Sequence, residues 1–174
     1  MFNDPDSLLN VLFRWAHIIF GIIWLGHLYF FNLVNVPFQG DLEKDLKPKV
    51  NPKLLLRAFY WFRWGAMYTF LIGLLLFGFK YFHQGLFFEQ GGGISNRALW
   101  ILFGGLLGTI MWFNVWFIIW PAQQKALNIA NRYPDLPADQ KAKAARMAML
   151  FSRTNTLLSI PMLFAMVSAQ NLPY

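Results

Sequence analysis

The side chains most able to do chemistry in this chain lie inside stretches that are otherwise apolar. Arg14, His17 and His27 fall within residues 13–32, which read FRWAHIIFGIIWLGHLYFFN. Ionisable groups are costly to bury in an apolar medium, so those found there usually face a bundle interior or a cavity. Imidazole is a good ligand for haem iron, and a guanidinium matches the planar carboxylate of a haem propionate. These residue types therefore predict a cofactor site.

Further polar residues lie at matching depth in the other apolar stretches. With a rise of 1.5 Å per residue, an inner layer is expected about 9 Å from one end of each helix. This layer contains His27, Arg63, Asn114, Arg153 and Asn155. Because the layer draws on all four stretches, we expect its residues to bind the cofactor, with Arg63 and Arg153 as partners of propionates. A quinone head group or a small anion would also suit His27 with the two arginines.

A second layer is expected toward the opposite end. Arg14 and His17 are three residues apart and share one helix face, and Lys80 and His83 lie near the same end. His17 and His27 are separated by about 15 Å of rise and about 280° of rotation, so they cannot ligate one iron from the same helix. Both are candidate metal ligands, each with a partner from another helix or with a site of its own.

Four apolar helices must position these residues. The chain has 174 residues, of which 57% are hydrophobic and 13% charged. About 20 apolar residues cross a hydrocarbon core that is about 30 Å thick. The stretches near residues 9–34, 57–82, 98–120 and 147–169 meet this requirement. The sequence therefore predicts an all-α, integral membrane four-helix bundle, with residues 1–174 forming a single domain.

The net charge of +7 is unevenly distributed along the chain. Basic residues crowd the first and third connections, and the second connection and both tails hold few. The crowded residues are Lys44, Lys47, Lys49, Lys53, Arg57, Lys125, Arg132, Lys141, Lys143 and Arg146. The positive-inside rule then places the first and third connections in the cytoplasm and both termini on the opposite, periplasmic side. The charge is thus a topology signal, and we expect no nucleic-acid partner.

The absence of cysteine narrows the cofactor chemistry. With no cysteine there is no disulfide, no iron–sulfur cluster and no C-x-x-C-H site for covalent haem. A redox centre held by other ligands is expected to be a noncovalent, b-type haem. Two simpler interpretations remain open: Arg63 and Arg153 as anchors whose side chains reach the headgroups, and the histidines as packed core residues.

Four motifs give the chain a family resemblance. They are RWAHIIFGIIWLGHLYF, YWFRWGAMYTFLIGLLL, GTIMWFNVWFIIWPAQQKAL and SRTNTLLSIPMLFAMVSAQNLP. In this order they resemble the urate-oxidase N-terminal family, the membrane portion of bacterial membrane urate hydroxylases. The resemblance singles out Arg14, His17, Trp24, Trp61, Asn114, Pro121, Arg153 and Asn155. More distantly, the first helix is similar to that of the four-helix, haem-binding protoporphyrinogen oxidase of bacteria.

The chain also departs from the family pattern. Members typically carry a glutamate where this chain has Gly65, a histidine where it has Thr154 and a small polar residue where it has His27. They are longer and often carry a fused cytochrome c domain. The resemblance therefore implies an electron-transfer or oxidoreductase subunit that works with a separate cytochrome c, a quinone or other respiratory subunits. A cofactor-free accessory subunit and a urate- or purine-oxidising enzyme are the alternatives.

Overall fold

The computed structural model describes residues 4–172, so the ends of the predicted domain, residues 1–3 and 173–174, lie outside the described residues. It is all-α, with 84% of the chain helical. The first half contains α1 (Pro5–Tyr29), η1 (Phe30–Asn35), α2 (Val36–Asp41), α3 (Lys47–Phe77) and η2 (Gly78–His83). The second half contains α4 (Asn96–Phe113), η3 (Asn114–Ile119), α5 (Trp120–Ala126), η4 (Ile129–Asn131) and α6 (Ala138–Asn171).

These elements join into four long helices. Segments η1, η2 and η3 are π-helical. Segment η1 joins α1 to α2, η2 extends α3, and η3 joins α4 to α5. The continuous helices are Pro5–Asp41, Lys47–His83, Asn96–Ala126 and Ala138–Asn171, and each is long and apolar enough to cross a membrane. Each predicted span lies inside one of them. The all-α class and the four helices of membrane-spanning length are thereby confirmed.

Local sequence explains where two of the helices begin. The Asp4 carboxylate accepts hydrogen bonds from the backbone N–H groups of Asp6 and Ser7 at the start of α1. The Ser7 hydroxyl and these N–H groups also lower the pKa of Asp4 below its usual range. At the start of α4, the Ser95 hydroxyl accepts from the backbone N–H of Ala98. Both are N-caps that satisfy donors left open in a first turn.

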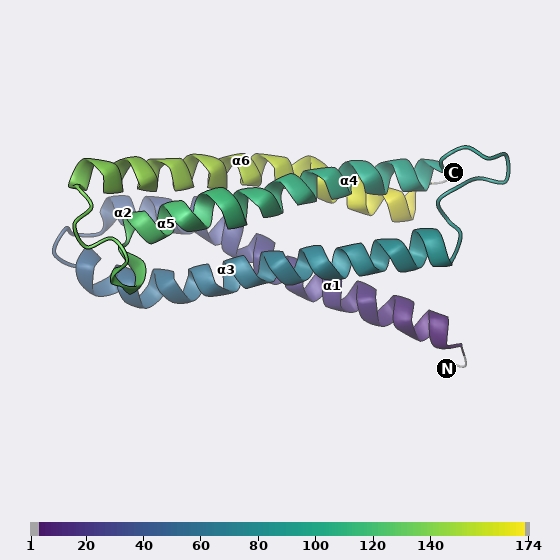
Figure 1. Ribbon diagram of the computed structural model, residues 1–174, viewed down its shortest axis with the longest axis horizontal. Helices are drawn as coiled ribbons and strands as arrows, with labels where there is room; N and C mark the ends of the chain where they lie inside the picture. Colours follow the sequence, from purple (N-terminus) through teal and green to yellow (C-terminus); the bar gives the residue numbers. More distant parts are fainter. Residues whose placement is uncertain (1–3, 173–174) are drawn as a thin grey trace.

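The helices form two antiparallel pairs (Figure 1). The first two long helices pack through α1 and α3, and the last two through α4 and α6. Contacts between the pairs are sparser. In Figure 1 the first half of α1 diverges from α6 toward the N-terminus. The connections 42–46 and 127–137 lie at one end, called the basic end below, and residues 84–95 connect the pairs at the opposite end.

Tight packing is concentrated in the half of the bundle near the basic end. Its buried core includes Leu28, Phe31, Leu55, Phe59, Phe62, Met111, Val115 and Ile119. Within the first pair, α1 and α3 approach most closely at Gly65, where an added Cβ would lie 3.1 Å from the Trp24 backbone nitrogen. Within the second pair, an added Cβ at Gly104 would lie 3.2 Å from Ala165 Cβ. Small residues therefore set the spacing of both pairs.

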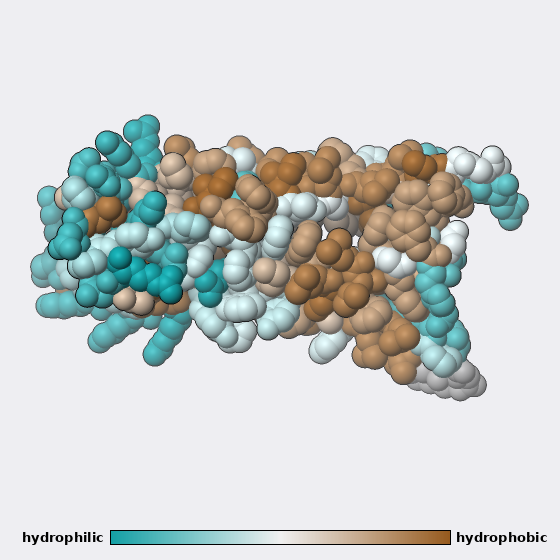
Figure 2. All heavy atoms as spheres, viewed as in Figure 1, coloured by the Kyte–Doolittle hydropathy of each residue, from teal (hydrophilic) through white to brown (hydrophobic). Residues whose placement is uncertain are grey.

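The surface carries the polarity of a membrane-spanning bundle. Figure 2 shows hydrophilic side chains gathered at the basic end and hydrophobic side chains over the middle of the long helices. Many large apolar residues are exposed there, among them Ile22 at 63%, Leu157 at 70% and Phe164 at 62%. A contiguous apolar surface of this kind marks contact with a membrane or with protein partners.

Candidate functional site

A cavity lies between all four long helices in the half of the bundle away from the basic end. It has a volume of about 720 Å³ and is called the four-helix cavity below. Most of its wall is apolar, with residues from α1, α3, α4 and α6. Its polar lining includes Arg14, His17, Thr69, Lys80, Thr109, Gln170 and Asn171. Its size lies within the range of small-molecule and cofactor sites.

His17 is held in one orientation on this wall. Its Nδ1 lies 2.9 Å from the backbone oxygen of Thr69, and because a carbonyl only accepts, Nδ1 carries the proton. Nε2 then has a free lone pair, and no described residue is hydrogen-bonded to it. A backbone carbonyl on one ring nitrogen is the usual way in which a metal-binding histidine is oriented. Gly73 leaves space for the ring, since an added Cβ there would lie 2.9 Å from His17 Cε1.

Two cations line the same cavity. Lys80 is only 6% exposed, and its Nζ donates to Gln170 Oε1 over 2.8 Å. Arg14 lies one turn before His17 and also lines the cavity. No carboxylate among the described residues pairs with either cation. Arg14 is exposed and Lys80 is buried. Because a buried charge such as that of Lys80 is normally paired, this end of the cavity is suited to an anionic group of a ligand.

The position of Lys80 depends on the π-helical segment η2. A π-helical turn contains an extra residue, and such turns are frequent at functional sites. Within η2 both Lys80 and Tyr81 are buried. The sequence pattern predicts that Lys80 lies near the same end as Arg14 and His17, but it contains no signal for Gln170, Thr69 or Gly73. Their roles depend on contacts across the bundle, which helix periodicity does not reveal.

One further donor faces this region without a partner. Trp24 lines the four-helix cavity, and its Nε1 is buried with no hydrogen-bond acceptor among the described residues. An unsatisfied buried N–H is costly, so an acceptor group of a ligand would be favourable there. The cavity thus combines an oriented imidazole, two cations and an open donor with apolar walls. This is the chemistry of a site for an amphipathic anion with a metal centre.

The structure divides the predicted inner layer among separate environments. Asn114 and Asn155 hydrogen-bond each other, with Asn114 Nδ2 at 2.8 Å from Asn155 Oδ1. Asn155 Nδ2 also donates to the Met111 backbone oxygen over 2.9 Å. Both side chains are buried between α6 and the third long helix, and neither lines the four-helix cavity. Their polar groups are already engaged in joining the two helices.

The two inner-layer arginines also lie apart. Arg63 contacts aromatic rings, with its Cζ 4.1 Å from the centroid of Trp120 and 5.1 Å from that of Trp116. Such cation–π contacts stabilise a guanidinium at a half-buried position. Arg153 is exposed on α6. Neither arginine lines the cavity that contains His17.

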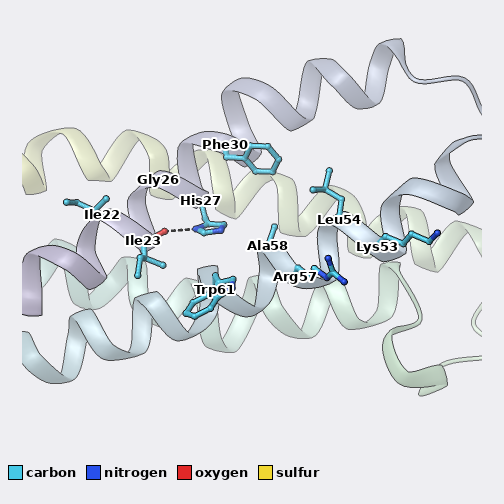
Figure 3. A pocket seen from close by; sticks show the side chains of 10 residues that line it. All are labelled: Ile22, Ile23, Gly26, His27, Phe30, Lys53, Leu54, Arg57, Ala58 and Trp61. Atoms are coloured by element: carbon cyan, nitrogen blue, oxygen red, sulfur yellow. Dashed lines mark hydrogen bonds between the residues drawn. The ribbon is translucent and has the colours of Figure 1, made fainter.

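His27 lies in a different pocket, between α1 and α3 (Figure 3). Its Nδ1 donates to the backbone oxygen of Ile23 in its own helix over 2.7 Å. This pocket, called the α1–α3 groove below, has a volume of about 540 Å³ and opens to the surface. His17 and His27 therefore belong to separate sites. His83, in turn, is exposed, and its Nε2 lies 3.0 Å from Asp6 Oδ2.

The described residues contain no cluster of three or more histidine, cysteine or carboxylate side chains that would hold a bare metal ion. A metal at His17 would therefore need a ligand cage of its own, such as a porphyrin. Met162 and Met166 of α6 line the same cavity, and a thioether is a known haem ligand. The donor set fits a haem.

Fold and site together define a class of protein: an all-α bundle of four helices, each of membrane-spanning length, around an amphipathic cavity with one oriented histidine. Residues 87–172 match the family model described as urate oxidase N-terminal. This segment is similar to the urate-oxidase N-terminal family, and the resemblance found in the sequence motifs is confirmed. No curated protein and no solved structure matches the chain.

Proposed function

We propose that this protein is an integral membrane electron-transfer subunit that binds one b-type haem in the four-helix cavity. The observation that carries the proposal is His17, whose Nδ1 is fixed on the Thr69 carbonyl while Nε2 remains available beside a cavity of about 720 Å³. A bound haem supplies reversible one-electron transfer. The protein's own residues then have to hold it, orient it and exclude water.

Each of these tasks has a residue to perform it. His17 Nε2 is the iron ligand, and the hydrogen bond to Thr69 holds the imidazole plane in place. Arg14 and Lys80 neutralise the propionates, with Gln170 holding the Lys80 ammonium in position. The apolar walls would exclude water from a bound haem, and such burial is one of the factors that set its reduction potential.

The apolar surface and the uneven charge support a place in a membrane, and the respiratory role is part of the proposal. The basic end is assigned to the cytoplasmic side by the positive-inside rule, which puts both termini and the four-helix cavity toward the periplasm. We accordingly place the chain in a bacterial inner membrane. The proposed partners are a separate cytochrome c or a quinone and the other membrane subunits against which the exposed apolar helices pack.

The decisive experiment is a reduced-minus-oxidised visible spectrum with a pyridine haemochrome assay. The chain is expressed with added haem and purified in detergent. We expect a b-type spectrum with about one haem per chain, and His17→Ala is expected to reduce the haem content at least about tenfold by removing the only protein iron ligand on α1. The matched control is His27→Ala, which removes the other histidine of α1 and is expected to keep the spectrum.

Filling the cavity tests the same proposal without removing a ligand. An added Cβ at Gly105 meets no atom within 4 Å, and Gly105 lines the cavity, so Gly105→Leu is expected to fold and to exclude haem. A folded wild-type chain without a haem spectrum would overturn the haem assignment. It would favour the cofactor-free accessory subunit or, with urate turnover, the purine-oxidising enzyme.

A further inference from the structure

The α1–α3 groove has an ordered polarity along its length (Figure 3). At the end farthest from the basic connections lie Ile22 and Ile23, followed by Gly26 and His27. Phe30, Ala58 and Trp61 form the middle of the wall, and Arg57 and Lys53 lie nearest the basic end. The apolar end therefore lies toward the middle of the long helices, and the cationic end lies toward the basic connections.

The cations of this groove are not used within the fold. Lys53 and Arg57 are exposed on α3, and no described carboxylate forms an ion pair with either of them. His27 Nδ1 is engaged with its own helix, and no described residue is hydrogen-bonded to Nε2. Three nitrogen-bearing side chains therefore face one opening without an anion. The exposed ring of Trp61, at 52%, lies beside them and is suited to the headgroup region.

We propose that the α1–α3 groove is a binding site for an anionic phospholipid. The phosphate lies against Arg57, Lys53 and His27, and an acyl chain follows Gly26 toward Ile22 and Ile23. Charge complementarity and the order of polar and apolar residues both match a lipid of the leaflet at the basic end. Basic pockets between transmembrane helices on the cytoplasmic side bind such headgroups. The inference rests on the membrane insertion in the proposed function but not on haem.

The first test removes charge. Wild-type protein in mixed micelles of phosphatidylglycerol and phosphatidylcholine is examined by native mass spectrometry, and retained lipids are counted. Each cation near an anionic lipid contributes about fivefold in affinity, so Lys53→Gln with Arg57→Gln is expected to lower the preference for phosphatidylglycerol about 30-fold. The matched control, Lys44→Gln with Lys49→Gln, removes the same charge from exposed positions outside the groove and is expected to leave most of the preference.

The second test blocks the groove and keeps its charge. An added Cβ at Gly26 meets no atom within 4 Å, so Gly26→Leu is expected to fold with its side chain in the acyl-chain path. It should lose the bound phosphatidylglycerol and retain the haem spectrum. Gly105→Leu should do the reverse, because Gly105 lines the four-helix cavity. A failure of the lipid proposal and a failure of the haem proposal can thus be distinguished, because each is tested by a different variant.

Three results would overturn the lipid proposal. They are equal retention of phosphatidylcholine by the wild type, equal losses in the two charge pairs, and full retention of phosphatidylglycerol by Gly26→Leu. Displacement of phosphatidylglycerol by glycerol 3-phosphate at equal concentration would also contradict it, because a site built for a lipid draws part of its affinity from the acyl chain.

Discussion

At the scale of residues, chemical type alone did not separate function from packing. Asn114 and Asn155 were predicted to bind a cofactor because they share a depth with His27. In the structure they satisfy each other and the Met111 carbonyl. His17 and Lys80 differ, since each retains a group that the fold does not neutralise. Under the proposed function, a binding residue is distinguished by hydrogen-bonding or charge capacity that the fold leaves unused.

The asparagine pair gives a residue-scale prediction. Asn155→Leu removes both interhelical hydrogen bonds and leaves the buried Asn114 amide without its partner, so we expect a loss of about 1–2 kcal/mol in unfolding free energy. The haem spectrum should be unchanged. Reversible unfolding in sodium dodecyl sulfate measures the first quantity. Thr154→Val, at an exposed neighbouring position, is the control and is expected to change stability little. Loss of haem at unchanged stability would instead make Asn155 a binding residue.

At the scale of elements, the spacing of helix pairs decides where space is left. Gly65 lets α1 approach α3 at Trp24, and Gly104 lets α4 approach α6 at Ala165. Gly104 and Gly108 are four residues apart, a spacing that is typical of close helix approach. Only Gly104 makes such a contact, because an added Cβ at Gly108 meets no atom within 4 Å and Gly108 lines the four-helix cavity. One glycine of the pair closes an interface, and the other leaves room for a ligand.

Gly65 gives the element-scale prediction. An added Cβ would lie 3.0 Å from Ile23 Cγ2 and 3.1 Å from the Trp24 backbone nitrogen, so α1 and α3 would have to separate. Gly65→Ala is expected to cost about 1–3 kcal/mol in the same unfolding assay. Gly26→Ala lies on the same helix pair in open space, and it should be neutral or stabilising because glycine is unfavourable within helices. Equal effects of the two variants would contradict the close approach at Gly65.

At the scale of the whole molecule, the two ends of the bundle differ in packing and in charge. The buried core lies toward the basic end, and the four-helix cavity lies toward the other end, where α1 diverges (Figure 1). If the positive-inside orientation holds, a haem at His17 would be on the side of an external cytochrome c. The lipid groove would be in the opposite leaflet. The two proposed sites then occupy opposite halves of one bundle.

Because the chain contains no cysteine, its orientation can be measured directly. Single cysteines are introduced at Ser7 and Gly91 at one end and at Lys44 and Asp135 at the basic end. A membrane-impermeant thiol reagent on intact cells, with the outer membrane permeabilised, should label the first two sites. The other two should react only after the inner membrane is opened. The opposite labelling pattern would invert the topology and place the His17 cavity toward the cytoplasm.

The sequence by itself determined the all-α class, the four long helices and the resemblance to the urate-oxidase N-terminal family. These features depend on the number and order of apolar residues and on the spacing of motifs, which the linear sequence contains in full. It also placed Arg14 and His17 on one face, since residues three apart are helical neighbours. Only the tertiary structure decided which residues at one depth share a site. Depth along a helix does not specify the rotation of the helix about its axis or which helices pair. Rotation and pairing place His27, Arg63, Arg153 and the two asparagines in separate environments. They also bring Lys80, Gln170 and Thr69 to the cavity that contains His17.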